Sequence, residues 1–363
     1  MGSGLPPMVD LLRRMVDASA SDLHLKADTP PVLRVHGRLE PLQLPPLAAA
    51  DLESRLAEVA SEEQRTAFAM EKELDFAYTL EGVGRFRVNA AVQRGSVTMA
   101  FRLVRAEAPT IEELGLPDVC RSLVLKPRGL ILVTGPTGSG KSTTLAAMVD
   151  YLNERERRHV VTIEDPIEYL HPNKQCVISQ RELGADTNSF AAALRHVLRQ
   201  DPDVILVGEM RDLETIGAAV TAAETGHLVL ATLHTPSAPQ TIDRIIDSFP
   251  PHQQQQIRVQ LSTVLEAVLC QTLVPRADGG GRLAAVEVMM ATPAVRNLIR
   301  EGKTFQLPGV IQTGAQYGMR TLDQALAGLC AANAISRDEA LARCTDPQEI
   351  LRSAGAGAAT ALG

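Results

Sequence analysis

Three glycines, a lysine and a serine are spaced so that they could bind phosphate. The stretch that starts at Gly135 and ends at Ser142 matches the pattern G-x-x-x-x-G-K-[ST] at every fixed position. Glycine has no Cβ, so the backbone here can curl and bring its N–H groups close to an anion. Lys141 can place a charge on the β- and γ-phosphates, and Ser142 can offer a hydroxyl to Mg²⁺. The candidate nucleotide-binding residues are Gly135, Pro136, Thr137, Gly138, Ser139, Gly140, Lys141, Ser142 and Thr143.

Acidic side chains follow two other apolar runs. One run leads into Glu164, Asp165 and Glu168, and a later one leads into Glu209. Carboxylates at the carboxyl ends of strands beside a phosphate loop are well placed to orient Mg²⁺ or water. Glu209 stands where phosphate-loop NTPases usually carry Asp, and a carboxylate there can position the attacking water. We therefore predict a Mg²⁺ site made by Ser142 with Glu164, Asp165 or Glu209, directly or through water.

Two histidines bracket a third apolar run. His227 and His234 are seven residues apart. Ordinary surface histidines at the two ends of a strand would account for this pattern. A zinc pair is disfavoured, because the spacing does not suit local ligation and no cysteine is close in sequence.

These residues need strands and helices to position them. Leu130–Val133 is typical of a strand buried on both faces, and apolar residues at helical spacing follow from Ser142. Strand, glycine loop and helix in that order are the context expected of a phosphate loop. The runs before Glu209 and Glu164 are predicted as further buried strands, so the fold class is α/β.

The region before the loop is predicted to be a compact α+β unit of about one hundred residues. Within it, one hairpin places Arg85, Arg87 and Arg102 on a single exposed face, opposite an apolar face. An ordinary solvated strand face and a functional surface both fit this pattern.

The pattern of apolar residues and breakers predicts the remaining elements. We expect helices at residues 9–18, 50–70, 188–200, 239–248 and 252–274, a linker with a lead-in helix at 107–126, and strands at 21–25, 32–37, 74–80, 85–92, 97–104, 160–163, 204–209, 226–235 and 283–290. Beyond Ser237 the chain is expected to be largely helical.

Composition argues against several classes of protein. The chain of 363 residues has room for two domains. Its net charge of −7 and scarce aromatic residues argue against a nucleic-acid binder. Five scattered cysteines indicate reduced thiols, and no apolar run is long enough for a membrane span or a signal peptide, so we expect a cytoplasmic protein. Met1–Gly4 look like a start and a flexible scar, and Ala354–Gly363 are expected to be disordered.

Five stretches together resemble the secretion-type hexameric ATPases, the GspE/PulE superfamily. They are Ala20–Leu25, Gly135–Thr144, Ile163–Glu168, Leu206–Asp212 and Gly226–His234. Within that superfamily, the sequence resembles the type IV pilus retraction (twitching-motility) ATPases, the PilT family, through the stretches Ala294–Lys303 and Tyr317–Gln324. Pilus-extension and type II secretion ATPases usually carry a four-cysteine zinc insertion after the histidine box, where this chain has only Cys270.

The resemblance implies a domain plan and an assembly. A PAS-like domain would occupy residues 1–106, a linker and lead-in helix 107–128, and a RecA-like ATPase domain 129–363, with a helical C-terminal subdomain from about residue 237. A homohexameric ring would bind ATP between domains and subunits and hydrolyse it, with Mg²⁺, to ADP and phosphate.

The resemblance also implies roles for single residues. Glu209 would activate water, and Glu164 and Glu168 would support Mg²⁺ and the water. His227 and His234 would sense the γ-phosphate or link the site to a subunit interface. The charge-stabilising arginines of the family come from the N-terminal domain, which makes Arg85, Arg87 and Arg102 candidates to contact the phosphate.

The leading hypothesis is a motor that dismantles the pilus through an inner-membrane platform protein, docked at the cytoplasmic face of that membrane. A paralogous retraction ATPase would be a further partner. Within the family, the alternative is an accessory retraction ATPase or one dedicated to DNA uptake. From other classes, the alternatives are a RecA-like nucleic-acid translocase and a non-hydrolysing ring. The acidic charge and the presence of Lys141, Ser142 and Glu209 argue against these two, and we expect no stable nucleic-acid partner.

Overall fold

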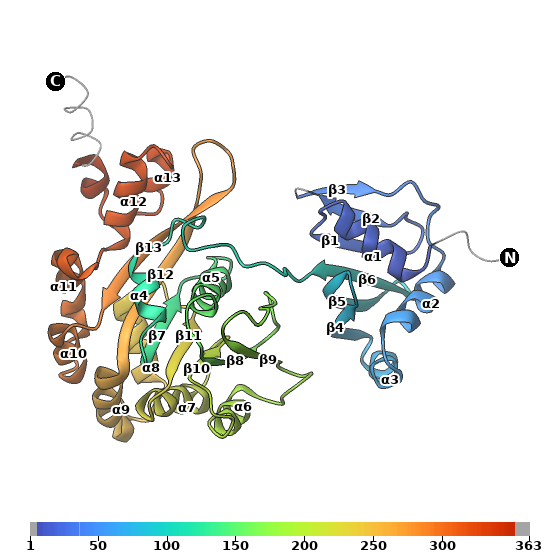
Figure 1. Ribbon diagram of the computed structural model, residues 1–363. Coiled ribbons are helices and arrows are strands. Elements are labelled where there is room, and N and C mark those ends of the chain that lie inside the picture. Colours follow the sequence, from blue (N-terminus) through green and yellow to red (C-terminus); the bar gives the residue numbers. More distant parts are fainter. Residues whose placement is uncertain (1–5, 36, 353–363) are drawn as a thin grey trace. The chain divides into compact units, whose positions relative to one another are not determined.

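The computed structural model describes residues 6–35 and 37–352, which form two compact units (Figure 1). The first unit runs to Ala106 and also contains Glu168–Leu170, and the second contains Glu107–Ile167 and the chain from His171 onward. The expectations for residues 1–4 and 354–363 concern segments outside the described residues. Within the described part of the chain, no helix is both long enough and apolar enough to cross a membrane.

The first unit is an antiparallel sheet covered by helices. Its six strands lie in the order β3-β2-β1-β6-β5-β4. The elements are α1 (Met8–Asp17), β1 (Asp22–Leu25), β2 (Val32–Val35), β3 (Arg38–Pro41), α2 (Ala49–Val59), α3 (Glu62–Glu71), β4 (Glu73–Leu80), β5 (Gly84–Gln93) and β6 (Ser96–Leu103). Alternating residues of β5, such as Phe86 and Val88, are buried against α1 and α2 in one core.

Two expectations for this unit are wrong. The helix predicted at residues 50–70 is two helices, because Ser61 begins a second one. The Ser61 hydroxyl accepts from Gln64 N at 3.2 Å and the Gln64 side chain accepts from Ser61 N at 2.9 Å, which is a capping box. The structure also contains β3, which the proline-rich stretch had concealed.

The second unit is built on a mixed seven-stranded sheet in the order β13-β12-β7-β11-β10-β8-β9. Only β13 is antiparallel to its neighbour. The strands are β7 (Gly129–Thr134), β8 (His159–Glu164), β9 (Val177–Glu182), β10 (Val204–Val207), β11 (Leu228–Leu233), β12 (Leu265–Pro275) and β13 (Arg282–Met290).

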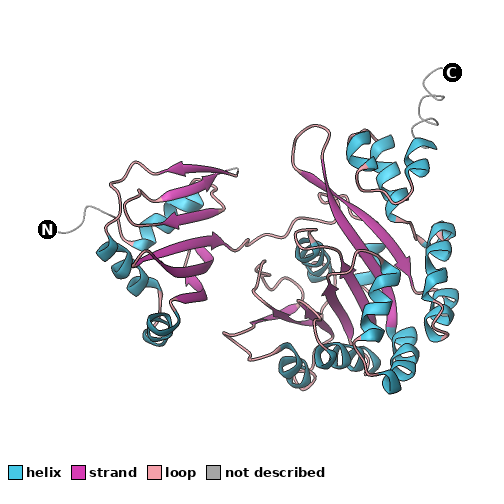
Figure 2. Ribbon diagram, turned by 180° about the vertical axis from the view of Figure 1, so that it is seen from behind, coloured by secondary structure: helices cyan, strands magenta, loops and turns pink. Residues whose placement is uncertain are grey.

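Helices cover both faces of this sheet (Figure 2). They are α4 (Val119–Val124), α5 (Lys141–Asn153), α6 (Phe190–Val197), α7 (Leu213–Glu224), α8 (Ala238–Asp247), α9 (Pro251–Val264), α10 (Pro293–Arg300), η1 (Thr304–Gln306), α11 (Leu307–Thr313), η2 (Ala315–Tyr317), α12 (Leu322–Ala331) and α13 (Arg337–Leu341). Leu130 and Leu132 of β7 face the core under α6–α11, whereas Ile131 and Val133 face the core under α4 and α5. This arrangement confirms the predicted α/β fold class.

The helix predicted at residues 252–274 is wrong in its second half. Helix α9 ends at Val264 and the chain continues as β12. Most residues from Leu265 to Val274 are buried, because β12 lies between β7 and β13. An apolar run buried on both faces has no period that separates a strand from a helix.

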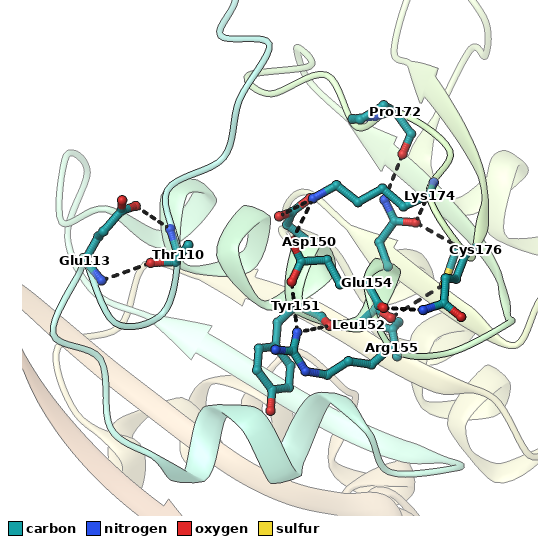
Figure 3. Close-up of polar contacts among 12 residues, drawn as sticks. Thr110, Glu113, Asp150, Tyr151, Leu152, Glu154, Arg155, Pro172, Lys174 and Cys176 are labelled. Atoms are coloured by element: carbon teal, nitrogen blue, oxygen red, sulfur yellow. Dashed lines mark hydrogen bonds and ion pairs between the residues drawn. The ribbon is translucent and has the colours of Figure 1, made fainter.

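Helix α5 is held at its far end by the segment after β8. The side chain of Asn153 is fully buried; its amide donates to Pro172 O at 2.7 Å, and its carbonyl oxygen accepts from Lys174 N and Cys176 N. Figure 3 shows Lys174 reaching Asp150 of the same helix. These contacts fix the C-terminal end of the helix that begins at the glycine loop.

Candidate nucleotide-binding site

The glycine loop follows β7 and leads into α5. Gly138 and Gly140 have φ values of 79° and 90°, in the region that favours glycine. Pro136, Thr137 and Gly138 are exposed, so the middle of the loop faces solvent. The first turn of α5 leaves backbone N–H groups without intrahelical partners and carries the positive end of the helix dipole. The loop therefore offers an anion site at a helix N-terminus.

Lys141 opens α5 and is folded back onto the loop. Its Nζ donates to Gly135 O at 2.9 Å and to Pro136 O at 3.1 Å, and the residue is only 8% exposed. Ser142 and Thr143 follow in the same turn and are half-buried. An ammonium held by two carbonyls is close to the place where phosphate oxygens would enter.

Glu209 lies just beyond the carboxyl end of β10. The backbone around it is fixed by both neighbouring strands: Gly208 N donates to Ile163 O at 2.7 Å, and Thr232 Oγ1 donates to Gly208 O at 2.6 Å. A Cβ on Gly208 would lie 3.1 Å from Glu164 Cα, so a side chain at residue 208 would push β10 and β8 apart. Glu209 is thus placed at the same edge of the sheet as the loop.

A chain of polar contacts joins Glu209 to Lys141. Glu209 Oε1 lies 2.6 Å from Arg211 Nε and 3.1 Å from His234 Nε2. The other ring nitrogen of His234, Nδ1, lies 3.4 Å from Lys141 Nζ and 3.4 Å from Thr137 Oγ1. With its hydrogen on Nε2, facing the carboxylate, His234 has an acceptor at Nδ1, facing the lysine and the hydroxyl. The histidine therefore bridges the loop and the acid.

Glu164 lies at the carboxyl end of β8, next to β10. Its Oε1 accepts from Thr162 Oγ1 at 2.6 Å and from Gln180 Nε2 at 3.1 Å. The Gln180 carbonyl oxygen accepts from His171 N at 2.9 Å, which fixes the orientation of the amide. Glu164 is therefore a carboxylate held in one place.

The other two acids of this stretch, Asp165 and Glu168, are less buried than Glu164. Asp165 is exposed, directly after Glu164. Glu168 is exposed too, and it belongs to the first compact unit. Glu164 and Glu209 thus lie at the sheet edge where the loop lies, and the roles expected of Asp165 and Glu168 stay predictions.

His227 is an expected site residue that lies far from the loop within the second unit. It comes before β11, and its backbone O accepts from Gly129 N at the start of β7. Strand β11 covers about 20 Å at about 3.3 Å per residue, so His227 and His234 stand at opposite edges of the sheet. His227 Nδ1 lies 2.9 Å from Ala222 O. His227 therefore lies at the sheet edge opposite to the loop in its own chain, and the roles expected of it stay predictions.

The three N-terminal arginines do share one face of the first sheet. Arg87 on β5 is directly opposite Arg102 on β6, and Arg85 lies two residues before Arg87. Arg102 Nε donates to Asp22 Oδ1 at 2.8 Å, and the same carboxylate lies 3.7 Å from Arg34 Nε. The Asp22 side chain is 8% exposed and that of Arg102 is 67% exposed. Arg102 is thus tethered at its Nε, while most of its side chain faces solvent.

Sequence reasoning missed three residues that hold the site together. Arg211 lies in a stretch that was singled out, but only its neighbour Glu209 was named. Gln180 is part of β9, a strand that was not predicted. Gln271 donates from Nε2 to Ser139 O of the loop, but it lies in β12, where a helix was expected, so this contact could not be foreseen.

Partial burial and nearby charge act in opposite directions on Glu209. Burial raises the pKa of its carboxyl, and the hydrogen bonds from Arg211 and His234 with the charge of Arg211 outweigh that effect, so the pKa is lowered. The carboxyl is therefore ionised at neutral pH. On β12, burial raises the pKa of Cys270 to about 12, so this thiol stays protonated.

The donor set fits Mg²⁺. Ser142 supplies a half-buried hydroxyl beside the loop, and Glu164 and Glu209 supply carboxylates at the same edge. Among residues 6–35 and 37–352 there is no group of three or more His, Cys, Asp or Glu side chains that could hold a metal on their own. Such an arrangement suits Mg²⁺, which keeps several waters and is bound by few protein oxygens together with substrate phosphates.

The chain matches known proteins along nearly its whole length. A family model described as type II/IV secretion system protein matches residues 9–322. A type IV pilus retraction ATPase, PilT, of Pseudomonas aeruginosa is 50% identical over 343 residues, which is 94% of this chain and 99% of that protein. The type IV pilus ATPase PilU of the same organism is 44% identical over 340 residues, covering 94% of this chain and 89% of that protein.

Solved structures agree. A crystal structure of the pilus retraction motor PilT with bound ADP is similar to this chain, with a TM-score of 0.89 and 46% sequence identity. The match covers 96% of this chain and 100% of that one.

Proposed function

This chain belongs to the family of type II/IV secretion system proteins, and on that premise we propose that it is the ATP-hydrolysing motor of type IV pilus retraction. The observation that carries the proposal is the chain of contacts Lys141–His234–Glu209 at the edge where the glycine loop lies. It joins a phosphate-binding lysine to an ionised carboxylate through one side chain.

Binding begins at the loop. We expect the phosphates to replace the carbonyls of Gly135 and Pro136 as partners of Lys141 Nζ, because a charge-assisted bond to phosphate is the stronger one. His234 lies within 3.4 Å of that same Nζ. Movement of the ammonium toward phosphate therefore changes the contacts of His234, and through Nε2 those of Glu209.

Hydrolysis needs a water molecule placed in line with the γ-phosphorus. The water oxygen forms a bond to phosphorus, the bond to the β–γ bridging oxygen breaks, and ADP leaves with that electron pair. Glu209 is proposed to orient the water and accept its proton. Mg²⁺, when bound, would neutralise charge on the phosphate oxygens. Glu164, held by Thr162 and Gln180, would support that ion or the water.

Arg85, Arg87 and Arg102 are proposed to stabilise the phosphate charge in a ring. They share one face of the first sheet, and Arg87 and Arg102 are exposed. An arginine supplied to a phosphoryl-transfer site can be worth several powers of ten in rate. The tether of Arg102 to Asp22 leaves Arg87 as the exposed arginine to test first.

The assembly follows from the same premise. We propose a homohexamer on the cytoplasmic face of the inner membrane that acts on a pilus platform protein. A paralogous ATPase is a further partner, since P. aeruginosa has both PilT and PilU and both resemble this chain. The likeness to PilU also keeps an accessory retraction role as the second candidate.

Phosphate release from Mg-ATP, measured across protein concentrations with light scattering in parallel, tests the enzymatic part. We expect activity to rise with assembly, and Glu209→Gln to lower kcat at least a hundredfold, in the usual range for loss of a general base. Glu214→Gln is the matched control, because Glu214 is an exposed acid on α7. Equal activity of the monomer, or a silent Glu209→Gln, would refute the shared-site motor.

Cells lacking the chain test the pilus part. They should carry more and longer pili and lose twitching, and the wild-type chain should restore both whereas Glu209→Gln should not. An accessory role predicts instead that pili still retract without the chain, with reduced force.

A further inference from the structure

Gln271 on β12 contacts the phosphate loop at Ser139, from which it is 132 residues away in the sequence. The residue is 2% exposed, and both ends of its carboxamide are bonded. Its Nε2 donates to Ser139 O at 2.7 Å, and its Oε1 accepts from Thr144 Oγ1 at 3.0 Å. One side chain therefore ties the loop to the second turn of α5.

The orientation of this amide is determined by its partners. A backbone carbonyl can only accept, so the NH₂ group must face Ser139 O. The remaining oxygen then faces the Thr144 hydroxyl, which can donate. The glutamine carboxamide thus supplies one donor and one acceptor without carrying a charge.

Two of the three motif glycines pack against the same residue. A Cβ on Gly135 would lie 2.2 Å from Gln271 O, and a Cβ on Gly140 would lie 3.2 Å from Gln271 Nε2. Around Gly138 there is no atom within 4 Å of such a Cβ. The close approach of β12 thus disfavours any side chain at the first and last glycines of the motif.

We infer that Gln271 is a positioning residue that presets the phosphate loop for nucleotide. A loop that binds an anion must turn its N–H groups inward and its carbonyls outward. By holding Ser139 O, Gln271 keeps the negative end of one peptide away from the phosphates. Because the loop has this conformation before the nucleotide binds, the free energy of binding is not reduced by the entropy lost on ordering the loop. This inference rests on the nucleotide site proposed above.

Nucleotide affinity should then depend on the hydrogen-bonding groups of the side chain at residue 271 as well as on its volume. Gln271→Met keeps the size but has neither donor nor acceptor. Gln271→Glu keeps an acceptor for Thr144, loses the donor to Ser139 O, and adds a negative charge beside an anion site. Thr144→Val removes the other partner. Val268→Ala is the control: Val268 is buried in the same strand, in the core on the opposite face from α5, and has no part in the loop.

The experiment measures Mg-ADP affinity by calorimetry, ATP KM and kcat, and the thermal midpoint without nucleotide, all on the full-length chain. Loss of two ordinary hydrogen bonds predicts about 30-fold weaker Mg-ADP binding for Gln271→Met. The ATP KM should rise, and kcat should stay within about threefold of the wild-type value, because a correctly positioned loop stabilises the bound substrate and the transition state equally. Gln271→Glu should bind more weakly still. In the Thr144→Val/Gln271→Met double variant the losses should be less than additive.

The control separates positioning from general stability. Val268→Ala should lower the thermal midpoint and leave Mg-ADP affinity unchanged. The inference is overturned if Gln271→Met binds Mg-ADP as tightly as the wild type does. It is also overturned if Val268→Ala and Gln271→Met have the same thermal midpoint and lose the same Mg-ADP affinity. Should both Gln271 variants fail to fold, Thr144→Val alone decides, with about fivefold weaker binding expected and no change contradicting it. A wild-type chain that does not bind Mg-ADP would refute the proposed function itself.

Discussion

Replacing Arg296 with Ala tests whether Ala294–Lys303, a segment that resembles the retraction family, stabilises the folded state. Arg296 lies in α10, and its guanidinium caps the end of another helix: Nη1 donates to Ser262 O at 2.9 Å and to Thr263 O at 2.6 Å, at the end of α9. Nε donates to Ala291 O at 2.9 Å, and Nη2 to Glu266 Oε1 at 2.9 Å. A cation at a helix C-terminus also interacts favourably with the negative end of the helix macrodipole.

The size of the effect follows from these partners. Hydrogen bonds from a charged donor are worth about 1.5–3 kcal/mol each when partners are buried. The Arg296 side chain is 24% exposed, and Glu266 would keep Lys126 Nζ at 2.9 Å, so no acid is left unpaired. We therefore expect a loss of about 3 kcal/mol in the free energy of unfolding. In a unit of this size that lowers the midpoint by roughly 6–12 °C.

The assay is thermal unfolding followed by circular dichroism, because the chain has no Trp. All variants are compared at one protein concentration, since assembly shifts the midpoint. Arg296→Lys should recover part of the lost stability, because lysine restores the positive charge but not the several N–H donors of the planar guanidinium. Arg300→Ala is the control: Arg300 is exposed on the same helix and should change the midpoint by less than about 2 °C. An Arg296→Ala midpoint equal to that of Arg300→Ala would refute the reasoning.

Three further outcomes follow from the structure. Arg211→Ala removes a bond that lowers the pKa of Glu209, so the acid limb of the kcat–pH profile should move to higher pH; an unmoved limb would contradict this. Burial lowers the pKa of His171 from 6.5 to about 4, so its contribution to stability is complete above pH 6.5 and is lost as pH falls toward 4. His171→Gln should therefore remove up to about 3 kcal/mol of that acid sensitivity in urea titrations. Asp22→Asn weakens the tether of Arg102 and should lower the calorimetric midpoint of the first unit by about 5 °C, which an unchanged trace would disprove.

The phosphate loop could be predicted from sequence because its determinants are local. Lys141 and the glycines lie within one turn of chain, so their spacing alone specifies the strand, loop and helix. Gln271 could not be found in this way. The stretch Leu265–Val274 is mostly apolar and has no clear alternation of polar and apolar residues, and it becomes a strand because β7 and β13 pair with it. The residues of this stretch do not by themselves indicate that β7 and β13 will pair with it.

The two histidines show the same limit at the scale of one strand. His227 and His234 look equivalent in the sequence, one at each end of an apolar run. A strand separates its ends by its full length, so only His234 reaches the edge where Lys141 and Glu209 lie. A helix over the same residues would have left them about half as far apart. The difference lies in the secondary structure, which the histidines themselves do not determine.

Strand β12 explains how a distant segment can influence the nucleotide site. Strand β12 closely approaches two glycines, Gly129 at the start of β7 and Gly135 directly after its end: a Cβ on Gly129 would lie 2.4 Å from Glu266 Cγ, and one on Gly135 would lie 2.2 Å from Gln271 O. Glu266 is also bonded to Arg296. Loosening α10 should therefore release the start of β12, and with it the register that presents Gln271 to the loop. On this argument Arg296→Ala should raise the ATP KM as well as lower stability, whereas Val268→Ala should lower stability alone.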